Sequence, residues 1–311
     1  MRQVATENHF KHSVFSTMLA VVLGLVLVMS SPRGYGLTPS DDLLVEVSWL
    51  SKNTANADVK VFDLREPAAY ALGHVPGAVN LPVSLLFAAP PQHDQVAAVP
   101  VIRRVFGEHG VDKRRVAVLY DDGSLIAAAP GFWIFELFGH DHVVVLDGGL
   151  SAWQKSGLPL AHDVVIAQPS DFEPTVRPAR LATKFSTRLA ISNPRVDIID
   201  ARSNDNYRRS ATNGKTAYIP SAVHVPSDDL FQTVEGVSYL KTKGELKALF
   251  SSFDPSNKVI TYCTVGNKSA ITYFNLRRLG YDAANYDGSW REWGADPTLP
   301  VSWHEGTPAR P

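Results

Sequence analysis

The chain has 311 residues, of which 45% are hydrophobic and 20% charged, and its formal net charge is −1 with an isoelectric point near 6.8. This is the composition of a soluble globular protein, and it excludes a disordered or fibrous chain. A chain so close to neutral has no overall field that would favour nucleic acid or an anionic membrane, so a charged substrate must be recognised by a local site.

Residues 1–36 have the layout of a secretory signal peptide. Basic residues precede sixteen residues, 14–29, that contain two hydroxyl residues and one glycine among apolar side chains. Gly34 and Gly36 place small side chains at the −3 and −1 positions of a cut after residue 36. The run is short for a bilayer span, which needs about 20 residues, and an uncleaved N-terminal anchor is the alternative. We expect an exported protein, most simply periplasmic, whose fold does not rely on disulfides.

The rest of the chain alternates short β-rich runs with segments of helical character. The predicted strands are residues 59–64, 116–120, 143–146, 196–200 and 259–262. Strands that alternate with helices imply a mostly parallel sheet with helices on both faces. The clearest helix follows Gly244, where four apolar residues at i, i+3, i+4 and i+7 form one face: Leu246, Leu249, Phe250 and Phe253. A second helix is predicted over 268–278, with Gly280 as its stop signal.

Four sequence blocks occur twice, in the same order and about 140 residues apart. Residues 61–65 match 198–202 with a shared Asp-x-Arg, 74–82 match 218–226, 118–121 match 260–263, and the Asp-Gly-Gly of 147–149 matches the Asp-Gly-Ser of 287–289. The chain is therefore predicted to be a duplicated domain.

The domain boundaries follow from this repeat. The first domain is predicted over residues 40–165 and the second over 183–305. The segment between them, 166–182, is assigned as a linker because three prolines interrupt any periodicity there. The second domain carries an insertion over residues 208–217.

Cys263 is the only cysteine of the chain. It follows the apolar run 259–262 and precedes a loop that contains Gly266 and Lys268. In an α/β sheet, ligands bind at the carboxyl ends of strands, where the next helix presents its free N–H groups. Loop N–H groups, the helix dipole and a nearby cation each favour a thiolate over a thiol. We predict a reactive thiolate; the alternative is an inert buried cysteine.

The first domain has Asp121 at the position that matches Cys263. With Asp122 beside it, this loop has no thiol and places two negative charges where an anion would bind. We therefore expect a structural or interface role for the first domain, with the aspartates capping a helix that begins near Ser124.

Together the four blocks resemble the rhodaneses, and most closely the tandem-domain sulfurtransferases that use thiosulfate or 3-mercaptopyruvate. The resemblance covers about residues 40–305. It implies two tandem rhodanese-like domains, each a mostly parallel sheet flanked by helices on both faces, the first inactive and the second catalytic.

The resemblance also implies a reaction. As the catalytic residue, Cys263 would take the outer sulfur of a small sulfur-containing anion, hold it as a persulfide, and pass it to cyanide or a thiol. Backbone N–H groups that stabilise a thiolate can stabilise a persulfide anion as well. No metal or organic cofactor is implied, and no nucleic acid or obligate protein partner is evident.

The substrate-binding residues implied by the resemblance are Arg202, Thr264, Val265, Gly266, Asn267 and Lys268. Arg202 matches the family arginine that binds the anionic end of the donor, and its alternative role is to pair with Asp200. Thiosulfate enzymes typically carry Arg-Lys after the cysteine and mercaptopyruvate enzymes Gly-Ser, whereas this chain has Thr264 and Val265. We expect thiosulfate as donor slightly ahead of 3-mercaptopyruvate.

Three alternatives stay open. Arg208 and Arg209 are weaker candidates for donor binding, because their insertion lacks the family spacing and a solvated charge pair explains them equally well. A cysteine phosphatase would need arginine at the seventh loop position, counting the cysteine as one, where this chain has Ser269. A non-catalytic exported binding protein of the same fold would accumulate no enzyme-bound sulfur.

Overall fold

The computed structural model describes residues 42–89, 95–209, 211–212 and 215–305. The predicted signal segment, residues 1–36, lies outside these ranges. No helix within them is both long and apolar enough to span a bilayer.

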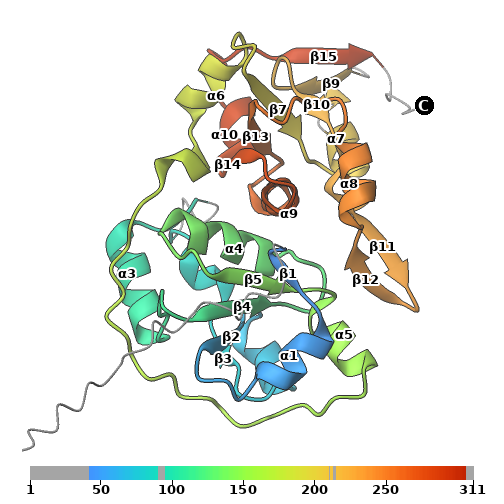
Figure 1. Ribbon diagram of the computed structural model, residues 1–311. Helices are drawn as coiled ribbons and strands as arrows, with labels where there is room; N and C mark the ends of the chain where they lie inside the picture. The colour runs from blue at the N-terminus through green and yellow to red at the C-terminus, as the bar shows by residue number, and fades with distance from the viewer. Residues whose placement is uncertain (1–41, 90–94, 210, 213–214, 306–311) are drawn as a thin grey trace, which may run out of the picture. The chain divides into compact units, whose positions relative to one another are not determined.

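The first domain is built on a five-stranded parallel sheet in the order β1-β5-β4-β2-β3 (Figure 1). Its strands are β1 (Leu44–Val45), β2 (Val59–Asp63), β3 (Val79–Asn80), β4 (Val116–Tyr120) and β5 (Val143–Leu146). Helices α3 (Val99–Glu108) and α4 (Ala128–Leu137) pack on one face, and α1 (Val47–Asn53) and α5 (Gly149–Lys155) pack on the other. The short helices α2 (Pro67–Ala71) and η1 (Val83–Leu86) lie in the connections.

The second domain repeats this plan. Its parallel sheet has the order β10-β7-β13-β14-β6, with strands β6 (Leu181–Ala182), β7 (Val196–Asp200), β10 (Val223–His224), β13 (Lys258–Tyr262) and β14 (Asp282–Tyr286). Helices α8 (Lys243–Leu249) and α9 (Asn267–Arg278) contribute to the core on one face, and α6 (Lys184–Ala190) and α10 (Ser289–Gly294) to the core on the other. Helices η2 (Pro178–Arg180), α7 (Asn204–Arg209) and η3 (Ser227–Leu230) complete the domain. The fold predicted from the repeat, two domains with parallel sheets between helices, is confirmed.

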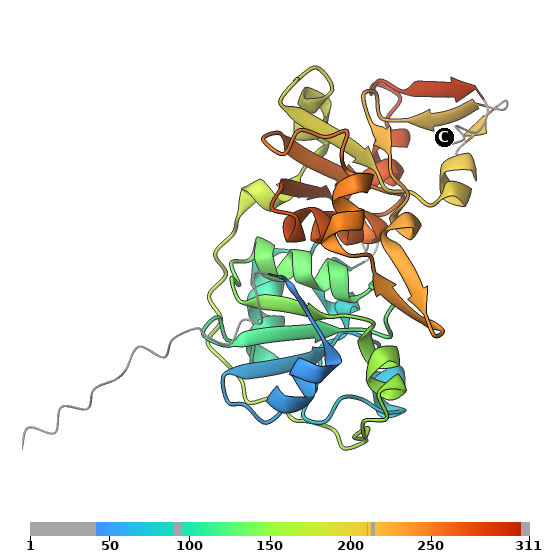
Figure 2. The same cartoon turned by 45° about the vertical axis from the view of Figure 1, so that its right-hand side comes forward.

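Two antiparallel elements accompany the second sheet (Figure 2). Strands β11 (Phe231–Val234) and β12 (Val237–Leu240) form a hairpin. Strands β8 (Ala211–Thr212), β9 (Lys215–Tyr218) and β15 (Ser302–Glu305) form a small sheet. The predicted insertion thus supplies strands to a sheet that the sequence did not predict, because its third strand comes from the far end of the domain.

The predicted elements lie close to the observed ones. The strand predicted over 59–64 ends one residue earlier, and the one predicted over 259–262 begins one residue earlier. Helix α8 ends at Leu249, so Phe250 and Phe253 belong to the turn that follows, yet both remain buried with Leu246. The last two residues of the predicted linker form β6 and pair with β14, so they belong to the second sheet.

Helices α4 and α9 pack against each other and join the cores of the two domains. All ten residues of α4 are buried, since its sequence is apolar on every side except at Glu136. The rings of Phe132 and Phe274 meet edge to face with centroids 4.8 Å apart. Glu136 accepts a hydrogen bond of 2.5 Å from the hydroxyl of Tyr273 and pairs with Arg277 at 3.1 Å. The single charge of α4 is thus satisfied by the other domain.

Replacing Arg277 with methionine tests this pairing. The substitution leaves the buried Glu136 carboxylate without its cation, and we expect the free energy of unfolding to fall by about 3 kcal/mol. Arg104 pairs with Glu108 on the exposed surface of α3, so Arg104→Met should cost no more than about 0.5 kcal/mol. Urea unfolding measures both values, and equal losses would contradict the importance of the buried pair.

Candidate active site

Cys263 follows β13, a central strand of the second sheet, and lies before the first turn of α9. Cys263 is 2% exposed to solvent. The thiol therefore lies at the carboxyl edge of the sheet, between the strand end and a helix N-terminus, as the sequence predicted. A sulfur buried at this point is shielded from water and lies where a helix N-terminus presents free backbone N–H groups.

The loop after Cys263 turns back over the sulfur. The backbone N–H of Gly266 donates to Cys263 Sγ at 3.1 Å. Gly266 has φ of 92°, and a β-carbon there would lie 2.8 Å from the backbone oxygen of Asp287. Only glycine fits both the left-handed conformation and this close approach. The geometry of the loop therefore requires glycine at position 266.

A second turn supports the loop from β14. The N–H of Cys263 donates to the hydroxyl of Ser289 at 3.1 Å, and this hydroxyl donates to the carbonyl of Tyr286 at 2.7 Å. The carbonyl of Cys263 accepts from the N–H of Trp290 at 3.0 Å. Ser289 is fully buried and has φ of 51°, a left-handed backbone conformation that residues other than glycine rarely adopt. Sequence reasoning assigned no role to Ser289, although its place in the repeated Asp-Gly-Ser block was a signal.

The remaining loop residues are partly exposed. Thr264, Val265 and Asn267 are half-buried, and Asn267 is the first residue of α9. Lys268 Nζ pairs with Asp228 Oδ1 of η3 at 2.7 Å, so the loop's cation is held on an acid of its own domain. Lys268 also lines a cavity of about 510 Å³, together with residues of the β11–β12 hairpin and of the first domain's loop. Binding of a donor by these residues stays a prediction.

Arg202 lies in the interior of the second domain. Its Nε donates to the two carboxylate oxygens of Asp200 at 2.9 and 3.0 Å, and its side chain is fully buried. In the first domain, Arg65 makes the same contact with Asp63, with Nε 2.9 Å from Oδ1. Because the pairing is present beside both loops, it belongs to the fold. The alternative role of Arg202, pairing with Asp200, is what the structure contains, and donor binding by Arg202 stays a prediction.

The two arginines of the insertion are not brought to the thiol by any contact that the structure records. Arg208 lies on α7 with an exposed side chain, and the side chain of Arg209 lies outside the described part of the chain. Within the described ranges, no group of three or more His, Cys, Asp or Glu residues could hold a metal ion.

The first domain fills its own loop with a carboxylate. Asp121 Oδ1 accepts from the N–H groups of Gly123 at 2.8 Å and Leu125 at 3.2 Å, and Oδ2 accepts from those of Ala127 at 3.0 Å and Ala128 at 3.1 Å. The predicted capping role is present for Asp121, although α4 begins at Ala128 rather than near Ser124, whereas Asp122 accepts the N–H of Ser124, before the helix. This loop therefore provides four N–H donors for one buried anion.

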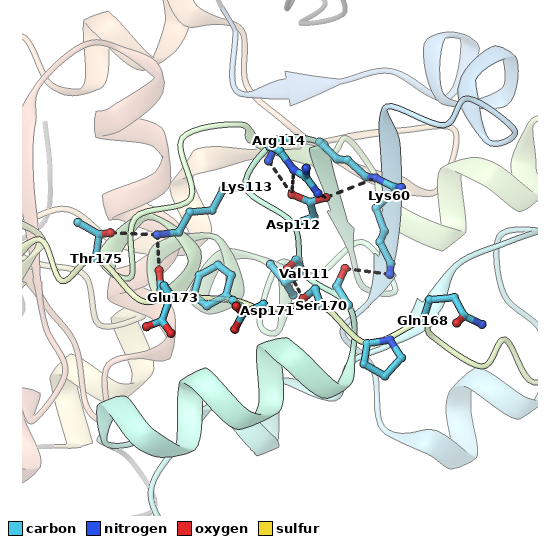
Figure 3. Close-up of a pocket in the computed structure, with 14 residues that line it drawn as sticks. Lys60, Val111, Asp112, Lys113, Arg114, Gln168, Ser170, Asp171, Glu173 and Thr175 are labelled. Carbon is cyan, nitrogen blue, oxygen red and sulfur yellow. Dashed lines mark hydrogen bonds and ion pairs between the residues drawn. The ribbon is translucent and has the colours of Figure 1, made fainter. Parts of the chain in front are cut away.

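A larger cavity lies elsewhere in the first domain. It has a volume of about 660 Å³ and is lined by the start of β2, the loop before β4 and the linker (Figure 3). Lys60 and Lys113 point into it, and they donate to the carbonyls of Gly110 and Glu173. Because it lies at the amino ends of the strands, this cavity is on the opposite edge of the sheet from the loops just described.

Comparison with known proteins identifies the family. The model of the rhodanese-like domain matches residues 46–156 and 183–296. The chain belongs to the rhodanese family. With two such domains and one thiol, this rhodanese is a tandem-domain sulfurtransferase, as the resemblance implied.

Relatives of this rhodanese carry two kinds of name. The thiosulfate sulfurtransferase of Corynebacterium glutamicum is 29% identical over 85% of this chain and 91% of its own. The 3-mercaptopyruvate sulfurtransferase of Escherichia coli K12 is 29% identical over 83% of this chain and 96% of its own. The crystal structure of SseA from Escherichia coli has 27% identity and a TM-score of 0.70, over 80% of this chain and 99% of SseA.

Gly266 offers a test of the loop geometry with an internal control. Gly266→Ala places a β-carbon against the Asp287 backbone, and we expect sulfur transfer to fall at least about tenfold through displacement of the loop. Gly280 has φ of 90° but nothing within 4 Å of its β-carbon position. Gly280→Ala should therefore cost only about 1 kcal/mol of stability and leave activity intact. Steady-state rates and thermal unfolding distinguish the two, and similar activities would rule out the tight packing at Gly266.

Proposed function

We propose that this rhodanese transfers a sulfane sulfur through a persulfide on Cys263, with thiosulfate as the favoured donor and cyanide or a thiol as acceptor. The observation that carries the proposal is the hydrogen bond from the N–H of Gly266 to Cys263 Sγ, directly before α9. The four N–H groups around Asp121 support it, because they illustrate how this kind of loop accommodates an anion.

The proposed reaction has two displacements. The Cys263 thiolate attacks the outer sulfur of thiosulfate, the sulfur–sulfur bond of the donor breaks, and sulfite leaves with the electron pair. The persulfide anion that remains carries the transferred sulfur. A nucleophile such as cyanide then attacks this outer sulfur, and the bond to Cys263 breaks to restore the thiolate and release thiocyanate. The loop N–H groups face an anionic sulfur at each stage, so little reorganisation is required.

The choice of donor rests on charge. Thiosulfate carries two negative charges, and Lys268 is the one cation within residues 264–268. Its pairing with Asp228 reduces the positive charge available to a donor, which keeps 3-mercaptopyruvate as the second candidate. The names of the relatives support both, since one is a thiosulfate enzyme and the other a 3-mercaptopyruvate enzyme.

Intact-mass measurement tests the persulfide and the donor together. Incubation with thiosulfate should add the mass of one sulfur atom to the wild-type chain, and subsequent cyanide should remove it with formation of thiocyanate. Cys263→Ser should take up no sulfur, because it lacks the nucleophile. Loading by 3-mercaptopyruvate alone would assign that donor instead. Loading by neither donor would favour the non-catalytic binding protein.

We further propose that the protein is exported by way of residues 1–36, with cleavage after Gly36. When the full chain is expressed in a bacterial host, the cleaved protein should appear in the periplasmic fraction with residue 37 at its N-terminus, because the segment combines basic residues, an apolar run and small residues at the cut. N-terminal sequencing measures this. Recovery of the uncut chain in the membrane fraction would indicate the anchor, and recovery in the cytoplasm would contradict export.

A further inference from the structure

We propose that Asp287 is a positioning residue for Cys263, and that the first domain acts on catalysis through it. Asp287 lies in the turn that follows β14, directly before Gly288 and Ser289. Its Oδ2 accepts a hydrogen bond of 3.0 Å from the backbone N–H of Val96, which belongs to the first domain. Its Oδ1 accepts from the N–H of Gly288 at 2.9 Å. One carboxylate thus joins the turn beside the thiol to the other domain.

The contact has a counterpart in the opposite direction. Asp147, which matches Asp287 in the repeat, accepts a hydrogen bond of 3.2 Å from the backbone N–H of Leu240 in the second domain. The donors correspond as well, because Val96 bridges to Phe87 just as Leu240 pairs with Phe231 in the β11–β12 hairpin. Each domain therefore donates one backbone N–H to the aspartate of the other, and the donor pairs with the residue that directly follows η1 or η3.

Two short links connect Asp287 to the sulfur. The backbone oxygen of Asp287 packs against Gly266, the residue whose N–H donates to Cys263 Sγ. Two residues after Asp287, the buried hydroxyl of Ser289 accepts the N–H of Cys263. A rotation of this turn would therefore move both the N–H on the sulfur and the acceptor that holds the cysteine backbone. Displacements of about 1 Å are enough to cost a hundredfold in rate when reacting groups are aligned this closely.

The counterpart at Asp147 accepts the same kind of inter-domain hydrogen bond without a thiol beside it. Burial raises the pKa of Asp147 and of Asp287 alike. Both turns pack on their loops, since a β-carbon at Gly123 would lie 2.6 Å from the backbone oxygen of Gly148. The loop beside Asp147 begins with the Asp121 carboxylate instead of a thiol. Loss of the Asp147 contact should weaken the association of the domains as much as loss of the Asp287 contact, without moving Cys263.

The test compares Asp287→Ala with Asp147→Ala in the full chain, and it rests on the proposed sulfur transfer from thiosulfate. We expect Asp287→Ala to lower kcat at least about tenfold while KM for thiosulfate changes less than about threefold. Asp147→Ala should lower the thermal midpoint about as much as Asp287→Ala does, but it should keep kcat within about twofold of the wild type. Asp287→Asn keeps an oxygen acceptor for Val96 but turns an amide NH2 toward the N–H of Gly288, so it should recover kcat in part, to a value between those of Asp287→Ala and the wild type.

A second variant removes the donor instead of the acceptor. Val96→Pro has no backbone N–H, leaves Asp287 in place, and should lower kcat as Asp287→Ala does. Equal kcat losses in Asp287→Ala and Asp147→Ala, or wild-type kcat in both Asp287→Ala and Val96→Pro, would overturn the positioning role. Failure of the wild-type chain to take sulfur from thiosulfate or 3-mercaptopyruvate would overturn the proposed function, and the positioning role with it.

Discussion

The packing of α4 against α9 is the constraint on which the rest of the structure depends. Each helix starts where the loop at the carboxyl edge of its own sheet ends, and each is buried along nearly its whole length. Packing two such helices together places both loops near the joint between the domains. The Glu136 carboxylate then fixes the pair, because Tyr273 and Arg277 satisfy it from the other side.

The two domains share one backbone arrangement, but their loops have different roles. In the first, four N–H groups surround the Asp121 carboxylate; in the second, the Gly266 N–H meets the sulfur of Cys263. The Asp-x-Arg pairs beside the two loops are alike, so they account for the fold and not for the difference. What separates a catalytic from a structural copy is the residue at the strand end and the loop built around it.

Much of this arrangement could be predicted from the sequence because it is local or repeated. The strands appeared as apolar runs, Gly266 marked a tight loop, and the repeat itself paired Cys263 with Asp121. Contacts such as Glu136 with Arg277 could not be predicted, since residues 141 positions apart leave no periodic signal in a single chain. Arg202 illustrates a different limit: its residue type suits an oxyanion or a carboxylate equally, so the sequence left both roles open, and the structure contains the pairing with Asp200.

The carboxylate in the first loop has a consequence for the thermodynamics of the whole chain. Asp121 is a ligand that cannot dissociate, so the loop around it is saturated at every concentration of substrate. The loop around Cys263 places the N–H of Gly266 on the sulfur and is not filled by a carboxylate. By mass action, anything that binds the folded state alone stabilises it. A donor anion bound beside Cys263 should therefore raise the stability of the second domain and leave that of the first, whose loop is already filled by Asp121, unchanged.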